Sequence, residues 1–217
     1  MPAIKIHDIG RLNRERLGDP YLSSEDERFE TIRTIIAETP SLMAILTSIR
    51  DLELPDSWLV SGGIYQTVWN ALTDRPASHG IKDYDIIYFD GSDLSFEAED
   101  IVIRQVEAKL PSLAGQLETR NQARVHLWYE KRFGQPYAPL SCSMEALTNY
   151  AAKTHAVAAR LRHDGKLDIH APFGLSNIFA MRIVPNYTLD NSKTHAEKGK
   201  RMQANWQELN VMSWQRP

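Results

Sequence analysis

Asp83-Tyr84-Asp85-Ile86-Ile87-Tyr88-Phe89 is the stretch that decides the fold, because two carboxylates stand at the head of an apolar run. In an extended strand successive side chains point to opposite faces, so Asp83 and Asp85 point the same way. Two acids on one face of a strand can share a divalent cation. The stretch therefore predicts a strand that begins with a metal-binding acid pair, and a strand with two solvated acids is the plain alternative.

A second apolar run, Trp58-Leu59-Val60, ends at Ser61-Gly62-Gly63. The apolar residues after it have the spacing of an amphipathic helix: Ile64, Val68, Ala71 and Leu72. The glycines are therefore expected to begin a helix, whose free N–H groups, unobstructed by a Cβ, form a phosphate site to which the Ser61 hydroxyl can add. A simple strand-to-helix turn is the alternative, because glycine readily adopts positive φ. A phosphate site followed by Asp-x-Asp suits Mg²⁺-assisted nucleotidyl transfer.

At these residues the chain resembles the polymerase-β-type nucleotidyltransferase superfamily, in which Gly-Gly or Gly-Ser begins a helix, the next strand carries Asp-h-Asp and a neighbouring strand carries a third acid. The likeness extends to a bacterial nucleotidyltransferase family through four segments: Trp58 to Asn70, Asp83 to Asp90, Glu118 to Tyr129 and Ala171 to Leu175. The resemblance implies an α/β (α+β) fold, with a nucleotidyltransferase-like mixed β-sheet flanked by helices and helical additions at both ends.

The resemblance also implies the acids of the site. Asp83 and Asp85 are expected to be catalytic and to bind Mg²⁺ or Mn²⁺. Glu118 is expected to complete the catalytic and metal-binding set as the third carboxylate and to act as the general base. A surface glutamate is the alternative for Glu118.

The residues expected to bind the nucleotide come from two segments: Ser61, Gly62, Gly63, Asn121, Arg124 and His126. The chain departs from the Gly-Gly-x-Val-Arg-Asp form of the superfamily, because Tyr65 and Gln66 replace the Val-Arg pair. A cation for the triphosphate is therefore missing from this helix, and Arg120 or Arg124 is a candidate to supply it.

The predicted activity is Mg-dependent transfer of a nucleoside monophosphate from an NTP to an unidentified hydroxyl acceptor, with release of pyrophosphate. A non-catalytic nucleotide-binding or regulatory module on the same fold is the alternative, favoured by the missing arginine and opposed by the retained aspartates. A haloacid-dehalogenase phosphatase does not fit, because its acids end the apolar strand, whereas Asp83 and Asp85 precede it.

Length and composition predict one domain over residues 1–217, with a core at about 57–185 and helical extensions at 24–52 and 190–210, because 42% of the residues are hydrophobic and 24% are charged. A net charge of −3 does not support a surface dedicated to nucleic acid but does not exclude one.

Cys142 is the only cysteine, which fits a reducing compartment. No uncharged run approaches the ~20 residues that span a bilayer, so a cytoplasmic protein without a membrane anchor is expected.

Several further elements are predicted from local signals. A capping box at Ser24 to Glu27 begins one helix, and Pro40 begins a second. A helix is expected at 96–110 with a buried stripe of Ile101, Val102, Val106 and Leu110. After Asn121 both a helix and a strand fit the pattern. Residues 143–152 are expected to be helical, 163–166 to form a hairpin turn, and 193–209 to form a helix.

Overall fold

One mixed sheet of five strands, in the order β3-β2-β1-β4-β5, organises the computed structural model, which describes residues 14–215. The strands are β1 (Trp58–Val60), β2 (Tyr84–Tyr88), β3 (Leu117–Asn121), β4 (Ala158–Leu161) and β5 (Leu167–His170). β1 is antiparallel to both β2 and β4, β4 is antiparallel to β5, and β3 is parallel to β2. The strand with the acid pair therefore lies between the strand that leads into the glycines and the strand that carries Glu118.

Helices precede, separate and follow these strands. The α-helices are α2 (Arg14–Gly18), α3 (Glu25–Ala37), α4 (Pro40–Asp51), α5 (Gly62–Leu72), α6 (Phe96–Lys109), α7 (Tyr129–Phe133), α8 (Ser176–Phe179) and α9 (Ser192–Asn205). The 3₁₀ helices are η1 (Pro111–Leu113), η2 (Gln122–Leu127), η3 (Ser143–Asn149) and η4 (Lys153–His155), and two short strands, β6 (Arg182–Ile183) and β7 (Asn210–Val211), pair in parallel.

The two helices before β1 form as their local signals predict. The Ser24 hydroxyl accepts a hydrogen bond from the Glu27 N–H at 3.2 Å, so Ser24 caps α3, and Pro40 occupies the first turn of α4. No single helix among residues 14–215 is long and apolar enough to cross a membrane, although α3 and α4 would pass that test as a pair bent by 90°. Their apolar faces pack into the protein core.

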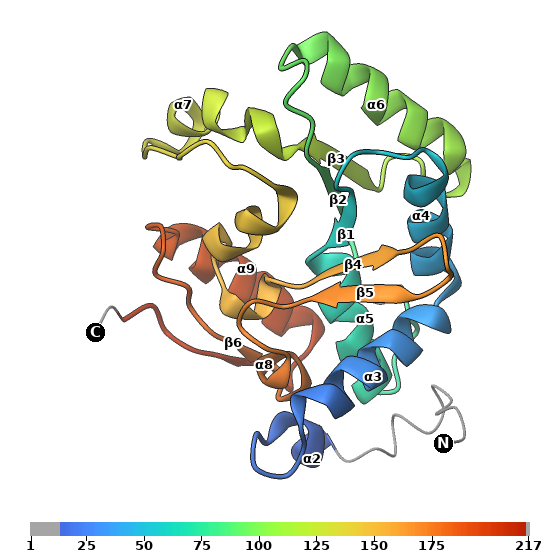
Figure 1. Ribbon diagram of the computed structural model, residues 1–217. Coiled ribbons are helices and arrows are strands. Elements are labelled where there is room, and N and C mark those ends of the chain that lie inside the picture. The colour runs from blue at the N-terminus through green and yellow to red at the C-terminus, as the bar shows by residue number, and fades with distance from the viewer. Residues whose placement is uncertain (1–13, 216–217) are drawn as a thin grey trace.

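Three predicted elements differ from the structure. The segment after Asn121 is a 3₁₀ helix followed by the short α7, which ends at Gly134 with φ of 72°, and residues 143–149 form a 3₁₀ helix. On α6 only the C-terminal part of the predicted stripe is fully buried, and Ile101 is 57% exposed. α6 projects past the edge of the sheet (Figure 1), so its outer turns have no layer to pack against.

The two faces of the sheet carry different cores. Leu59 and Ile86 belong to the large core, which α3, α4 and α5 complete, whereas Val60 and Ile87 belong to a smaller cluster with Leu147 of η3. Alternate residues of each strand enter opposite clusters, as the pleat requires. Figure 1 shows α3 and α4 on one side of the strands and α7 and α9 on the other. The acid pair lies on the same side as the smaller cluster, where packing leaves cavities.

Candidate functional site

The corner between β1 and α5 is tightly built. Ser61 has φ of 58° and ψ of −122°, a conformation in which a non-glycine residue is strained, and its N–H donates to the Val157 carbonyl at 2.8 Å. A Cβ on Gly63 would lie 2.7 Å from the Tyr84 ring, so only glycine lets α5 pack this closely against β2. Among residues 14–215 the N–H groups of Gly62 and Gly63 have no hydrogen-bond partner. The helix start therefore keeps the unpaired donors that an anion can use.

The acid pair lies beside this corner. Asp85 is directly opposite Val60 in the antiparallel register of β1 and β2, and Asp83 immediately precedes β2. Opposed residues point to the same face, so the Asp85 carboxylate projects next to Ser61, and both residues line one cavity. Asp83 forms an ion pair with Lys82, its exposed neighbour, at 3.5 Å.

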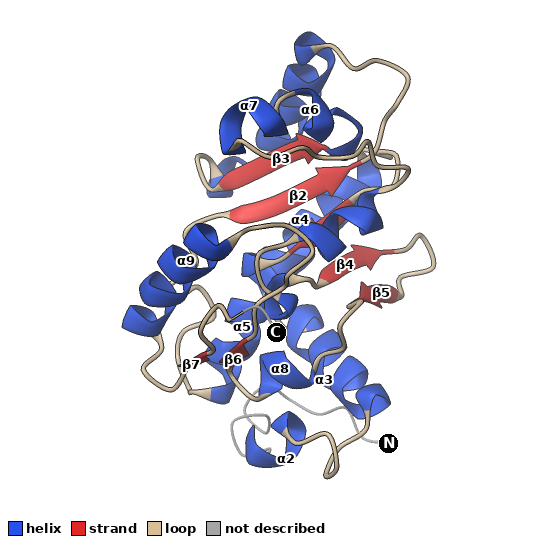
Figure 2. Cartoon of the chain, turned by 90° about the vertical axis from the view of Figure 1, so that its left-hand side faces the viewer, coloured by secondary structure: helices blue, strands red, loops and turns tan. Residues whose placement is uncertain are grey.

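Glu118 is opposite Asp85 in the parallel register of β2 and β3, and Figure 2 shows these two strands side by side. The two carboxylates therefore project from the same face of the sheet. Among residues 14–215, however, no group of three His, Cys, Asp or Glu side chains is arranged to hold a metal ion. Glu118 is exposed on the neighbouring strand, and its place as the third metal-binding acid stays a prediction.

Electrostatics single out Asp85. Burial raises the pKa of its carboxyl to about 6, and the negative charges of Asp83 and Glu118 add to that rise, while the ammonium of Lys198 opposes it. Mutual repulsion of this kind is relieved when a cation binds between carboxylates. Mg²⁺ is commonly held by one or two carboxylates, with water and substrate phosphates completing its six ligands. Asp83 and Asp85 therefore fit a divalent cation that arrives with a nucleotide.

Two cavities meet at Asp85. The first, called here the Ser61 cavity, has a volume of about 260 Å³ and is lined by Ser61, Asp85, His155 and Lys198. The second, called the aromatic cavity, has a volume of about 190 Å³ and is lined by Glu118 and by four rings: Trp128, Tyr129, Tyr137 and Tyr150. Asp85, Tyr129, Asn149 and Tyr150 line both. A further cavity of about 550 Å³, between the end of α4 and the β4–β5 hairpin, includes none of the motif acids.

Lys198 is the functional candidate that the sequence did not reveal. It lies on α9 together with Thr194, and these two residues and Asn191, the N-cap of α9, line the same cavity at helical spacing. Among residues 14–215 its ammonium has no ion-pair partner, although it is only partly exposed. The basic stretch at 193–201 was the one signal for it in the sequence, and that stretch does not say which lysine faces the acids.

His155 is the second residue that only the structure brings to the site. Its ring is 2% exposed and stacks on Tyr65 with centroids 4.9 Å apart. Its buried Nε2 atom has no hydrogen-bond partner among residues 14–215. Burial lowers the pKa of His155 well below its ordinary value, so the ring is neutral and can donate or accept one hydrogen bond.

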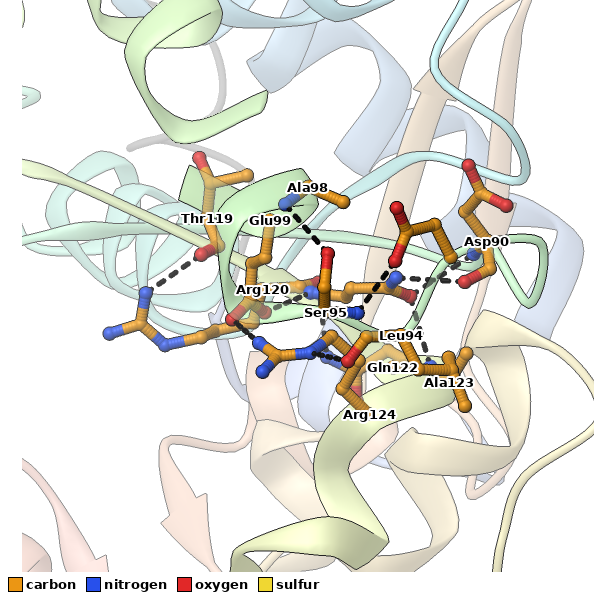
Figure 3. A network of polar contacts seen from close by, with 12 residues as sticks. Asp90, Leu94, Ser95, Ala98, Glu99, Thr119, Arg120, Gln122, Ala123 and Arg124 are labelled. Atoms are coloured by element: carbon orange, nitrogen blue, oxygen red, sulfur yellow. Dashed lines mark hydrogen bonds and ion pairs between the residues drawn. The ribbon is translucent and has the colours of Figure 1, made fainter. Parts of the chain in front are cut away.

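Arg124 and Asn121 lie in a different network, in which both bond to Glu99, and Figure 3 shows Arg124 and Glu99 within it. Arg124 is buried, forms an ion pair with Glu99 and donates from Nε to the Leu94 carbonyl at 2.9 Å. The Asn121 side chain accepts from the Asp90 N–H at 3.0 Å and donates to the Asp90 carbonyl at 2.8 Å. These bonds tie β3 to the loop before α6. Neither residue is among those that line the two cavities, and their part in nucleotide binding stays a prediction.

The remaining predicted residues divide between the site and its surroundings. Arg120 lines the aromatic cavity, and one of its guanidinium nitrogens donates to the Thr119 carbonyl at 2.8 Å. His126 lines neither cavity, and its buried Nδ1 atom has no partner among residues 14–215. Gly62 and Gly63 are buried, and Ser61, itself only 7% exposed, is the residue of the corner that lines a cavity.

Comparison with known proteins agrees with this architecture. A family model described as nucleotidyltransferase matches residues 47–211, which include both glycines and all three acids. A solved structure, described as an NMR structure that reveals a CCA-adding enzyme head domain, matches with a TM-score of 0.68 and 27% identity over 84% of this chain and 94% of that chain. No curated protein matches the chain.

These matches bear directly on the predictions. The polymerase-β-type resemblance, the mixed α/β fold and the class of enzyme are confirmed. Membership implies a nucleotide substrate, because the family is defined by nucleotidyl transfer. A match that spans most of the chain, on a fold that places the diglycine corner beside the acid pair, leads to one conclusion: the chain belongs to the nucleotidyltransferase family.

Proposed function

We propose that this protein is an Mg-dependent nucleotidyltransferase that transfers a nucleoside monophosphate from an NTP to a hydroxyl acceptor and releases pyrophosphate. The observation that carries the proposal is the position of Asp85, which lines two adjoining cavities, one with a cation and one with a further carboxylate. A cytoplasmic location, with access to the NTP pool, fits the single cysteine.

Asp83 and Asp85 hold the divalent cation in this proposal. When bound, Mg²⁺ neutralises charge on the phosphate oxygens and orients them for displacement. Asp85 lines the Ser61 cavity and Asp83 lies two residues before it on the same face, so a cation held by both carboxylates would attract the α phosphate of the NTP to the point where the cavities meet. Ionised Asp85 is needed for this, which predicts weaker metal binding as the pH falls through about 6.

The β and γ phosphates occupy the Ser61 cavity. The N–H groups of Gly62 and Gly63 donate to one phosphate, with the Ser61 hydroxyl beside them. The ammonium of Lys198 supplies the positive charge that Tyr65 and Gln66 do not. A lysine from a helix far away in the sequence can neutralise the phosphate charge, because a flexible ammonium acts on phosphate as a point charge.

Glu118 acts as the general base. It takes the proton of the acceptor hydroxyl, whose oxygen attacks the α phosphorus as the bond to the pyrophosphate oxygen breaks. The products are the nucleotidylated acceptor and pyrophosphate. Glu118 is exposed and lines the aromatic cavity but not the Ser61 cavity that Lys198 lines, an arrangement that suits attack and departure on opposite sides of the phosphorus.

The principal experiment measures pyrophosphate release over a panel of NTPs and hydroxyl acceptors, for the wild type and for the double variant Asp83→Asn with Asp85→Asn. We expect release by the wild type only in the presence of Mg²⁺ or Mn²⁺ and a loss of at least about 100-fold in the variant. Calorimetric titration with a non-hydrolysable NTP and Mg²⁺ provides the binding measurement. Equal binding by the two proteins would remove the metal assignment.

The alternative is a nucleotide-binding or regulatory module without turnover. It predicts that the wild type binds NTP and Mg²⁺ in calorimetry yet releases no pyrophosphate with any acceptor. The two measurements together therefore distinguish the enzyme from the module.

A matched pair of variants tests the phosphate assignment. Lys198→Gln removes the ammonium from the Ser61 cavity, and Lys200→Gln removes an exposed one from the same helix. With tripolyphosphate as the probe, in buffer without metal, we expect Lys198→Gln to weaken binding by about tenfold and Lys200→Gln to leave it unchanged. Equal effects of the two substitutions would mean that Lys198 contributes only to the overall charge.

A further inference from the structure

The aromatic cavity has no assigned occupant, and its position relative to the phosphates restricts what can bind there. Ser61, His155 and Lys198 line only the Ser61 cavity, whereas Glu118, Trp128 and Tyr137 line only the aromatic cavity. In-line displacement requires the attacking and leaving oxygens to lie on opposite sides of the phosphorus. If pyrophosphate departs toward Lys198, the attacking hydroxyl enters from the aromatic cavity.

The walls of this cavity suit a flat ring. Tyr129 packs against Tyr137 with centroids 4.5 Å apart and against Phe133 at 4.6 Å, so neighbouring rings hold the wall in place. Burial raises the pKa of Tyr137 and raises that of Tyr150 well above its ordinary value, which keeps both hydroxyls neutral donors. Ring faces of this kind bind planar heterocycles by stacking.

Polar groups lie where the edge of such a ring would reach. Gln122 and Asn149 also line the cavity. The Gln122 amide nitrogen donates to the Arg120 carbonyl and the Asn149 side chain hydrogen-bonds to Tyr137, and each amide keeps further donor and acceptor capacity for a heterocycle. The cavity volume of about 190 Å³ is sufficient for one ring system. A ring seated there leaves an attached sugar at the mouth, near Glu118.

We propose that the aromatic cavity is the acceptor site and that the acceptor is of the nucleoside class: a planar heterocycle that stacks against Tyr137 and Trp128 and carries a sugar hydroxyl to Glu118. The oxygen of that hydroxyl forms the new bond to the α phosphorus, the bond from phosphorus to the pyrophosphate oxygen breaks, and the proton passes to Glu118. This inference rests on the proposed function for its chemistry and on the cavity for its ligand class.

Binding of free nucleosides tests the cavity without requiring turnover. Calorimetry with a panel of four ribonucleosides is compared for the wild type, Tyr137→Leu, Tyr137→Phe and the control Tyr21→Leu, since Tyr21 is 95% exposed and remote from the site. We expect at least one nucleoside to bind the wild type, and its binding to weaken by roughly tenfold in Tyr137→Leu. Tyr137→Phe and Tyr21→Leu should retain it, which separates loss of stacking from loss of folding.

A second arm distinguishes the acceptor from the base of the NTP. A non-hydrolysable NTP with Mg²⁺ should bind together with the nucleoside and leave its affinity unchanged or higher. Displacement of the nucleoside by the NTP would overturn the inference, because the cavity would then hold the base of the donor. Absence of nucleoside binding to the wild type, or equal binding by Tyr137→Leu, would overturn it as well.

Pyrophosphate release separates this inference from the proposed function. Release that is stimulated by the bound nucleoside, and weakened in Tyr137→Leu, supports both. Release with other hydroxyl compounds but with no nucleoside overturns the inference alone. No release with any acceptor overturns the proposed function, and with it the acceptor role of the cavity.

Discussion

Asp85 is the residue at which the fold acts most strongly on a functional group. Its carboxyl is partly buried on the pleat between β1 and β3, and two other carboxylates, of Asp83 and Glu118, act on it. Burial and like charge both favour the protonated form. In the absence of a bound cation, the ionised form of Asp85 therefore lowers the stability of the folded protein. This is a common property of acids that bind metal ions.

Asp85→Asn should therefore stabilise the metal-free protein at high pH. The pKa in the folded protein is about 6 and the ordinary value is 3.8, so folding favours the protonated carboxyl, and that contribution to stability is lost as the pH rises from 3.8 through 6. At pH 8 we expect the variant to exceed the wild type by about 1–3 kcal/mol in free energy of unfolding, with little difference near pH 3.5. Urea denaturation in EDTA measures this. A difference that does not change with pH would contradict it, and added Mg²⁺ should reduce it.

Helix α9 places the ammonium of Lys198 in the Ser61 cavity, where it supplies a positive charge that α5 does not contain. Its position is set by close packing, because a Cβ on Gly199 would lie 2.7 Å from Cγ1 of Val211 in β7. His195, buried on the same helix, hydrogen-bonds through Nε2 to the Met212 carbonyl at 2.8 Å. These contacts hold Lys198 toward Asp85, so the geometry of the site depends on how closely α9 approaches β7.

Gly199→Ala tests this dependence. Helix propensity alone would make alanine the more stable residue by about 1 kcal/mol. The contact with the stiff side chain of Val211 should outweigh that gain, for a net loss of about 1–2 kcal/mol in free energy of unfolding. Displacement of α9 should also weaken tripolyphosphate binding. Adding Val211→Ala restores the space, and failure of this second substitution to recover binding would show that α9 is not positioned by this contact.

At the scale of the whole molecule, the helical segments that precede and follow the sheet in the sequence contribute to the same large core. Trp206, which follows α9, is fully buried, donates from Nε1 to Asn70 Oδ1 at 2.9 Å and packs against Trp69 with centroids 5.3 Å apart. The same core cluster contains Ile32 of α3 and Ile45 of α4. The segments before and after the sheet are therefore expected to fold together with it.

Trp206→Ala should lower the free energy of unfolding by about 3–5 kcal/mol, because it leaves a large cavity and the Asn70 amide oxygen without its partner. Far-UV and near-UV circular dichroism in urea should report one coincident transition for the wild type. Separate transitions would show that the C-terminal segment folds independently. Trp206→Phe, which keeps most of the packing, should lose less than Trp206→Ala.

Much of the corner and the acid pair could be predicted from the sequence because both depend on neighbours along the chain. Alternation places Asp83 and Asp85 on one face of an extended strand whatever the strand pairs with. Paired glycines before an amphipathic pattern begin a helix, and Ser24 caps α3 by a bond within one turn. After Asn121 the local signals were balanced between two periods, and the segment folded as a 3₁₀ helix that neither period describes.

The sequence by itself determined which residues share a face, and the tertiary structure decided which faces meet. Arg124 has the charge expected of a phosphate-binding residue, but buried Glu99 pairs with it, whereas Lys198, one of four Lys and Arg residues between 193 and 201, lines the cavity beside Asp85. The physical reason is that periodicity reports the direction of a side chain relative to its own element. The contacts of a charge are set by long-range packing, here of α6 against β3 and of α9 against β7, which leaves no local trace in the sequence.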